Sequence, residues 1–99
     1  LYTSPHLISP VERVQIAGVP VTEEEFTWAF DTVHRAAAPM DPHPTYFETV
    51  TAMAFVLYRQ RGVDTVVLEV GLGGRLDATN VVTPLVPVIT PVDFDHEAW

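Results

Sequence analysis

The chain has 99 residues, and its five basic and thirteen acidic side chains give a net charge of −8 at pH 7. This charge disfavours nucleic acid as a partner, because phosphate binding depends on clustered lysine and arginine. The absence of lysine and cysteine excludes, within this chain, a Gly-Lys-Ser/Thr phosphate loop, disulfides and zinc–thiolate sites. No apolar run approaches the length of a transmembrane helix, so we expect no membrane partner. With no cysteine, nothing indicates an oxidising compartment, and we expect a cytoplasmic location.

The N-terminal third predicts a short hairpin followed by a helix. Residues 13–16 and 19–21 alternate around Gly18, as expected of an edge strand or hairpin. Thr22 and Glu25 have the spacing of a capping box, which predicts that a helix begins after Thr22. The apolar side chains that share one face of this helix are Phe26, Ala29, Phe30 and Val33.

A proline-rich linker at residues 38–44 separates this helix from a second one. The second helix is expected to begin at Thr45 or Tyr46 and to end at Gly62. Thr45 and Glu48 again have capping-box spacing. Alternatively, this helix start and its aromatic ring could hold a flat heteroaromatic ligand. The side chains at helical spacing are Phe47, Val50, Thr51, Ala54, Leu57 and Tyr58.

Two apolar runs after the second helix predict buried strands. Residues 65–70 and 86–90 are rich in β-branched residues and lack alternation, which is typical of strands buried on both faces of a parallel sheet. The order of hairpin, two helices and two such strands predicts an α/β fold.

A glycine-rich loop, residues 69–80, follows the first of these strands, at the sheet edge where α/β proteins bind ligands. In one interpretation, Asp77 and Asn80 merely cap their own backbone. In the other, the loop binds a ligand. Glu69 is a costly carboxylate in an apolar strand, and His96 follows the next strand, so the two could share one Mg²⁺ or Mn²⁺ ion. Otherwise, Glu69 pairs with an arginine and His96 lies on the surface.

The loop also has features of two other nucleotide-binding classes. A dinucleotide-binding fingerprint would have to open a helix, whereas the residues after Thr79 contain prolines and valine pairs. An S-adenosylmethionine-dependent methyltransferase likewise needs a helix here, and Arg75 stands where a further glycine is expected. Methyltransferase remains an alternative, as does a truncated domain without catalytic activity.

The motifs together resemble the bacterial folylpolyglutamate synthase/dihydrofolate synthase family, which is related to the Mur ligases. The resemblance is carried, in the family's order, by residues 2–7, 12–14, 45–48, 51–52 and above all 68–80, followed by Asp95 and His96. It implies that residues 1–99 are part of the central ATP-binding domain. That domain is a three-layer Mur-ligase-type P-loop ATPase domain with a mainly parallel sheet.

The same resemblance implies roles for individual residues. Glu69 and His96 would bind the catalytic Mg²⁺, and the pterin would contact Thr45, Phe47, Asp77 and Ala78. The implied reaction uses ATP to activate a substrate carboxylate as an acyl phosphate, which the amino group of L-glutamate then attacks. Dihydropteroate, folates or both would be acceptors, a monovalent cation such as K⁺ is a further expected cofactor, and the full-length protein is expected to be a monomer.

The family's other catalytic parts are expected outside this chain. Its P-loop would lie upstream of Leu1, and its carbamylated lysine and C-terminal glutamate-binding domain would lie downstream of Trp99. Because the chain opens without methionine and stops directly after a dense motif, we expect both ends to be cuts in a longer protein. The 99-residue piece is therefore predicted to be inactive alone.

Overall fold

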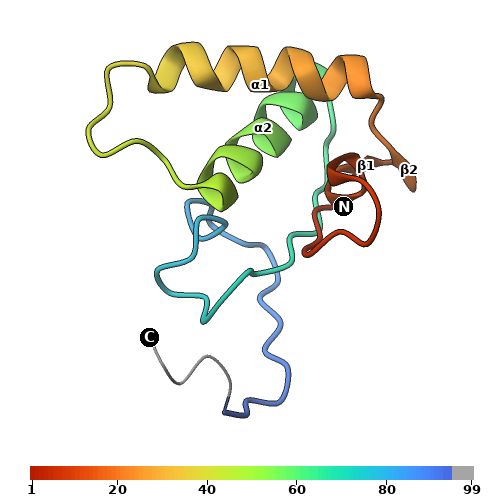
Figure 1. The fold of residues 1–99 in the computed structure, drawn as a ribbon. Helices are drawn as coiled ribbons and strands as arrows, with labels where there is room; N and C mark the ends of the chain where they lie inside the picture. Colours follow the sequence, from red (N-terminus) through yellow and green to blue (C-terminus); the bar gives the residue numbers. More distant parts are fainter. Residues whose placement is uncertain (95–99) are drawn as a thin grey trace.

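The computed structural model describes residues 1–94 and has a mixed α/β composition. A 3₁₀ turn, η1 (Pro10–Arg13), leads into the strands β1 (Gln15–Ile16) and β2 (Val19–Pro20), followed by the helices α1 (Glu23–Ala37) and α2 (Tyr46–Gln60). Figure 1 shows α1 lying across α2, with the hairpin beside the first turn of α1. The β1–β2 pair is antiparallel, as the alternation around Gly18 predicts. Ala17 and Gly18 form its tight turn, and both have positive φ angles.

Both helices begin where their capping boxes predict. The Thr22 hydroxyl accepts a hydrogen bond from the Glu25 N–H (3.1 Å), and the Glu25 carboxylate accepts one from the Thr22 N–H (2.9 Å). Thr45 and Glu48 repeat this arrangement at the start of α2. The helix α2 ends just before Gly62, whose φ of +64° lets the chain turn away.

The core lies between the two helices and the N-terminal segment. Every α2 residue predicted for the apolar face is buried or half-buried, and Met53 joins them. On α1, Ala29 and Val33 are buried, but Phe30 is 44 % exposed and stacks on His34 instead. Phe30 was predicted to share one face with Ala29 and Val33, but it does not share their burial. Neither helix in residues 1–94 has the length and apolar content that spanning a membrane requires.

Tyr2 ties the N-terminal segment to the chain that follows α2. Its N–H donates to the Val67 carbonyl (2.9 Å), and its carbonyl accepts from the Glu69 N–H (3.0 Å), which makes one parallel bridge between Tyr2 and Leu68. On its other side, Tyr2 forms an antiparallel bridge with Val14. Of the predicted strand at residues 65–70, only Leu68 takes part in strand pairing, through this bridge to Tyr2.

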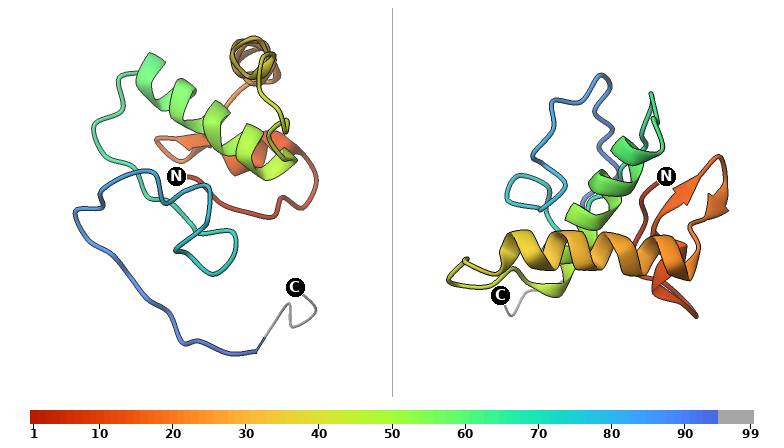
Figure 2. Two further views of the ribbon diagram at one scale, coloured as in Figure 1. Left: turned by 90° about the vertical axis from the view of Figure 1, so that its left-hand side faces the viewer. Right: turned by 90° about the horizontal axis from the view of Figure 1, so that it is seen from above.

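The two segments that were predicted to be buried strands are largely exposed in the structure. Val67 and Val70 are exposed, and no residue within 1–94 pairs with residues 86–90, which run as an extended and exposed segment below α2 (Figures 1 and 2). A β-strand forms only when a neighbouring strand satisfies its N–H and C=O groups. The prediction of buried strands at both places is therefore wrong for the described part of the chain.

Candidate functional site

The glycine-rich loop is closed by one carboxylate. Asp77 Oδ1 accepts hydrogen bonds from the N–H groups of Gly71 (3.0 Å) and Leu72 (2.9 Å). Asp77 Oδ2 accepts from the Thr79 N–H (2.9 Å) and hydroxyl (2.5 Å). Partial burial alone would raise the pKa of Asp77, but these hydrogen bonds outweigh it and hold the pKa below its ordinary value of 3.8. Asp77 thus organises its own loop, as the capping interpretation predicts.

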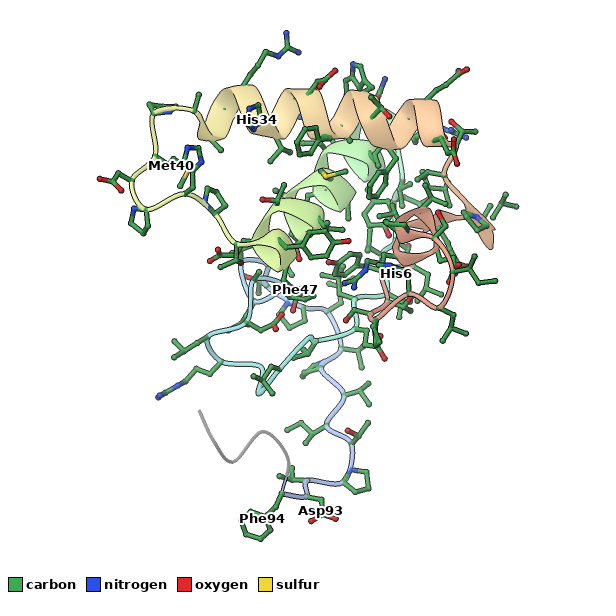
Figure 3. All side chains as sticks on the ribbon, viewed as in Figure 1. His6, His34, Met40, Phe47, Asp93 and Phe94 are labelled. Atoms are coloured by element: carbon green, nitrogen blue, oxygen red, sulfur yellow. The ribbon has the colours of Figure 1, made fainter. Side chains whose placement is uncertain are left out.

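The same loop lies against the start of α2. Phe47, in the first turn of the helix, places its ring edge so close to Gly71 that no side-chain atom would fit between them. The ring also packs against Tyr2, with a centroid separation of 6.1 Å. Figure 3 shows Phe47 projecting from the first turn of α2 toward the loop. Two residues predicted to share a ligand, Phe47 and Asp77, are therefore joined through Gly71.

Thr45 and Ala78 lie at the edges of this contact. The Thr45 hydroxyl is engaged by Glu48, because it accepts from the Glu48 N–H (3.2 Å) and donates to the Glu48 carboxylate (2.8 Å). The backbone N–H and then the hydroxyl of Thr45 lower the pKa of Glu48. Ala78 is half-buried beside Asp77 in the loop. The structure accounts for Thr45 as a helix cap, and its predicted contact with a ligand stays a prediction.

Glu69 differs from its predicted environment. Its side chain is exposed rather than buried among apolar residues, since the parallel sheet that would cover it does not form in residues 1–94. Its partner is not an arginine: Oε2 accepts a hydrogen bond from the Ser4 N–H (2.7 Å). His96, its predicted co-ligand, lies outside the described residues. Within the described residues, no group of three or more metal-ligating side chains is present.

Arg13 is a further residue at this site, and sequence reasoning gave it no role of its own. It is only 8 % exposed. Its Nε donates to His6 Nδ1 (2.8 Å), and its guanidinium lies over the Tyr46 ring, 5.4 Å from the centroid. Burying a charged group is costly unless other groups compensate. Arg13 is the last residue of the 3₁₀ turn η1 and is buried there.

Glu12 holds the segment that carries His6. Its carboxylate accepts from three consecutive N–H groups, those of Leu7 (3.0 Å), Ile8 (3.0 Å) and Ser9 (2.7 Å). These hydrogen bonds, first those from Leu7 and Ser9, lower the pKa of Glu12. The N-terminal segment thus contacts the start of α2 through Arg13 and Tyr2, and the start of α2 contacts the glycine loop through Phe47.

The comparisons with known proteins point to one family. The chain is 44 % identical over 99 residues to the dihydrofolate synthase/folylpolyglutamate synthase of Escherichia coli, covering 100 % of the chain and 23 % of that protein. It is 42 % identical to the protein of that name from Mycobacterium tuberculosis (95 % and 22 %) and 41 % identical to a folylpolyglutamate synthase of Arabidopsis thaliana (97 % and 18 %).

Other comparisons add no further relative: no family model and no solved structure matches the chain. The chain spans about a fifth of the length of the curated relatives that it matches. The similarity extends over nearly the whole chain, at 41–45 % identity. By its sequence, the chain is therefore similar, over nearly its whole length, to about one fifth of a dihydrofolate synthase/folylpolyglutamate synthase.

Proposed function

We propose that this chain is part of an ATP-dependent amide ligase that adds L-glutamate to dihydropteroate, to the glutamate tail of tetrahydrofolate, or to both. The observation that carries this proposal is the 41–45 % identity, over nearly all of the chain, to proteins named as these synthases. We further propose that residues 1–99 belong to the central ATP-binding domain, a three-layer Mur-ligase-type domain with a mainly parallel sheet. The protein would act as a cytoplasmic monomer.

The proposed pterin-binding part comprises Thr45, Phe47, Asp77 and Ala78. In support, the Phe47 ring is only half-buried and lies against the loop that Asp77 closes. A flat heteroaromatic ring could stack on such an aromatic side chain. Both oxygens of Asp77 already accept hydrogen bonds within the loop. We therefore infer that Asp77 acts mainly by holding the loop, and Ala78 with it, in place.

The proposed metal-binding part comprises Glu69 and His96. The carboxylate of Glu69 fits a hard divalent cation, because it is exposed and its Oε1 accepts no hydrogen bond from the described residues. The Ser4 N–H would orient this carboxylate through Oε2. When bound, Mg²⁺ would neutralise the negative charge on the transferred phosphoryl group. ATP would phosphorylate the acceptor carboxylate, and the amino group of glutamate would displace the phosphate to form the amide.

The methyltransferase alternative finds no support in the local structure. It requires a helix directly after the glycine loop, and residues 75–94 contain none. The three relatives named above are synthases by name, and none of them is named as a methyltransferase. A domain without catalytic activity differs from the proposed ligase in one measurable property, the release of ADP from ATP.

The test measures ADP release by the protein of the complete reading frame with ATP, Mg²⁺ and L-glutamate. Dihydropteroate and tetrahydrofolate are compared as acceptors, with acceptor-free reactions as the blank. Turnover with both would establish a bifunctional enzyme, and turnover with one would assign a single activity. Turnover with neither would contradict the proposal and favour a domain that binds without catalysis.

A further inference from the structure

Gly71 differs from the other glycines in what constrains it. Gly18, Gly62, Gly73 and Gly74 have positive φ angles, and a Cβ atom at any of them would meet nothing within 4 Å. At Gly71 the reverse holds, because a Cβ atom would lie 2.5 Å from Phe47 Cζ and 2.8 Å from Phe47 Cε1. The requirement for glycine at this position is therefore one of space.

The Phe47 ring is restrained by a second contact. It packs on Tyr2, which is fully buried and whose hydroxyl shares a hydrogen bond with Thr51 Oγ1 (2.9 Å). Both Tyr2 and Thr51 are fixed by the core around α2. A methyl group at Gly71 would thus have to displace a ring that already packs on a part of the molecule that does not yield easily.

The loop is restrained at the same point. The Gly71 N–H donates to Asp77 Oδ1, and a Cβ atom at Gly71 would lie 3.0 Å from this oxygen. The missing side chain therefore leaves room for two groups at once, the ring edge from α2 and the carboxylate that closes the loop. Gly71 sets how closely these two groups approach.

We propose that Gly71 is a positioning residue for the acceptor's flat ring, because its missing side chain sets the placement of the Phe47 ring against the Asp77-closed loop. This inference rests on the proposed function and adds to it a residue that acts through Phe47 and Asp77. It requires that a methyl group at Gly71 changes acceptor binding without changing the binding of ATP or L-glutamate.

The experiment introduces Gly71→Ala into the protein of the complete reading frame and determines KM for each substrate. We expect the KM of the pterin acceptor to rise roughly tenfold, because the displaced Phe47 ring would no longer lie where the acceptor's flat ring stacks; tenfold corresponds to about 1.4 kcal/mol. The KM values of ATP and L-glutamate should stay within about twofold, well inside that difference. Gly62→Ala is the matched control, because it strains a positive φ at the other end of α2 and touches nothing. It should lower the melting temperature and leave all three KM values unchanged.

A double-mutant cycle with Phe47→Leu tests the contact itself. Leucine lacks the Cζ and Cε1 atoms that a methyl group at Gly71 would meet. The added effect of Gly71→Ala on the acceptor KM should therefore fall below about twofold in this background. If Gly71→Ala alone fails to fold, recovery of folding in the double variant would support the contact. If Gly71→Ala and the double variant both failed to fold, the proposed contact between Gly71 and Phe47 would be overturned.

The remaining outcomes separate the two proposals. Active wild-type protein combined with an unchanged acceptor KM in Gly71→Ala would overturn the positioning role alone. An equal rise of all three KM values would do the same, because it would show a general structural role. Wild-type protein that turns over neither acceptor would overturn the proposed function, and the positioning role would fall with it.

Discussion

Asp77 acts at the residue scale as the closure of the glycine loop, and this role depends on its charge. Its pKa lies below the ordinary value of 3.8 because four hydrogen bonds outweigh the effect of partial burial. A carboxyl group with a lowered pKa in the folded state contributes stability above its unfolded pKa. That contribution is lost as the pH falls through the lower, folded value.

We therefore predict that the loop opens in acid. The amide protons of Gly71 and Leu72 should keep their protection from hydrogen exchange at neutral pH and lose it as the pH falls below the ordinary Asp77 pKa of 3.8, after correction for the intrinsic exchange rate. In Asp77→Asn, protection should be weaker throughout and should show no such transition. A transition of the same size in Asp77→Asn would assign it to another group.

Glu69 offers a second prediction at this scale. Glu69→Gln keeps an oxygen that can accept the hydrogen bond from the Ser4 N–H, so the fold should survive while the charge for a cation is lost. Metal-dependent turnover by the protein of the complete reading frame should fall by roughly 100-fold or more, since residues that merely support metal ligands contribute about 10- to 100-fold. Glu24→Gln, exposed on the first turn of α1, is the control. Unchanged turnover in Glu69→Gln would refute the metal role.

At the scale of elements, the two helices form a natural pair for comparison. Each begins with a threonine whose hydroxyl accepts from the N–H three residues on. Of the two, only α2 carries an aromatic ring, that of Phe47, against the glycine loop in its first turn. A change to either cap should therefore have the same effect on stability and a different effect on function.

We predict that Thr45→Ala and Thr22→Ala each destabilise the protein by about 1 kcal/mol, the usual contribution of such a cap. Thermal unfolding of the two variants, measured side by side, checks this equality. Only Thr45→Ala should raise the KM of the pterin acceptor, because fraying of the first turn of α2 displaces Phe47. If Thr22→Ala raised this KM equally, the effect would follow from lost stability alone.

The elements that sequence reasoning predicted well depend on local interactions. Capping boxes, the tight turn at Gly18 and helical spacing involve residues a few positions apart, so both helix starts and the hairpin follow from the sequence. The runs at residues 65–70 and 86–90 depend on pairing with distant strands. Their composition favours strands, yet within residues 1–94 only Leu68 finds a partner, in Tyr2.

The candidate site shows the same division. That Asp77 would cap its own loop is a local rule, and the structure confirms it. The exposure of Glu69 and the burial of Arg13 depend on which segments meet in three dimensions. The close approach of Gly71 and Phe47 joins positions far apart in the sequence. No spacing rule could have found this contact from the sequence. In the structure, the lack of a positive φ at Gly71 shows that glycine is needed there for space rather than for backbone conformation.

At the scale of the whole molecule, apolar surface gathers in the last part of the described chain. The exposed large apolar residues include Leu85, Val86, Val88, Ile89, Val92 and Phe94. Figure 2 shows this segment extending away from both helices. A contiguous apolar surface of this kind usually contacts another part of a protein.

We predict that the 99-residue chain, produced alone, binds a hydrophobic dye such as anilinonaphthalene sulfonate and releases no ADP from ATP with either acceptor. The dye should bind because residues 85–94 leave apolar side chains in water, and ADP release should be absent because the chain has no lysine for a phosphate loop. A version that ends at Asn80 is the matched control, since it keeps the core and lacks the apolar segment. Its fluorescence should fall clearly. Equal dye binding by both versions would place the dye-binding apolar surface in residues 1–80, where Leu7, Ile8 and Leu76 are also exposed. ATP-dependent ligation by the 99-residue chain would contradict its predicted inactivity.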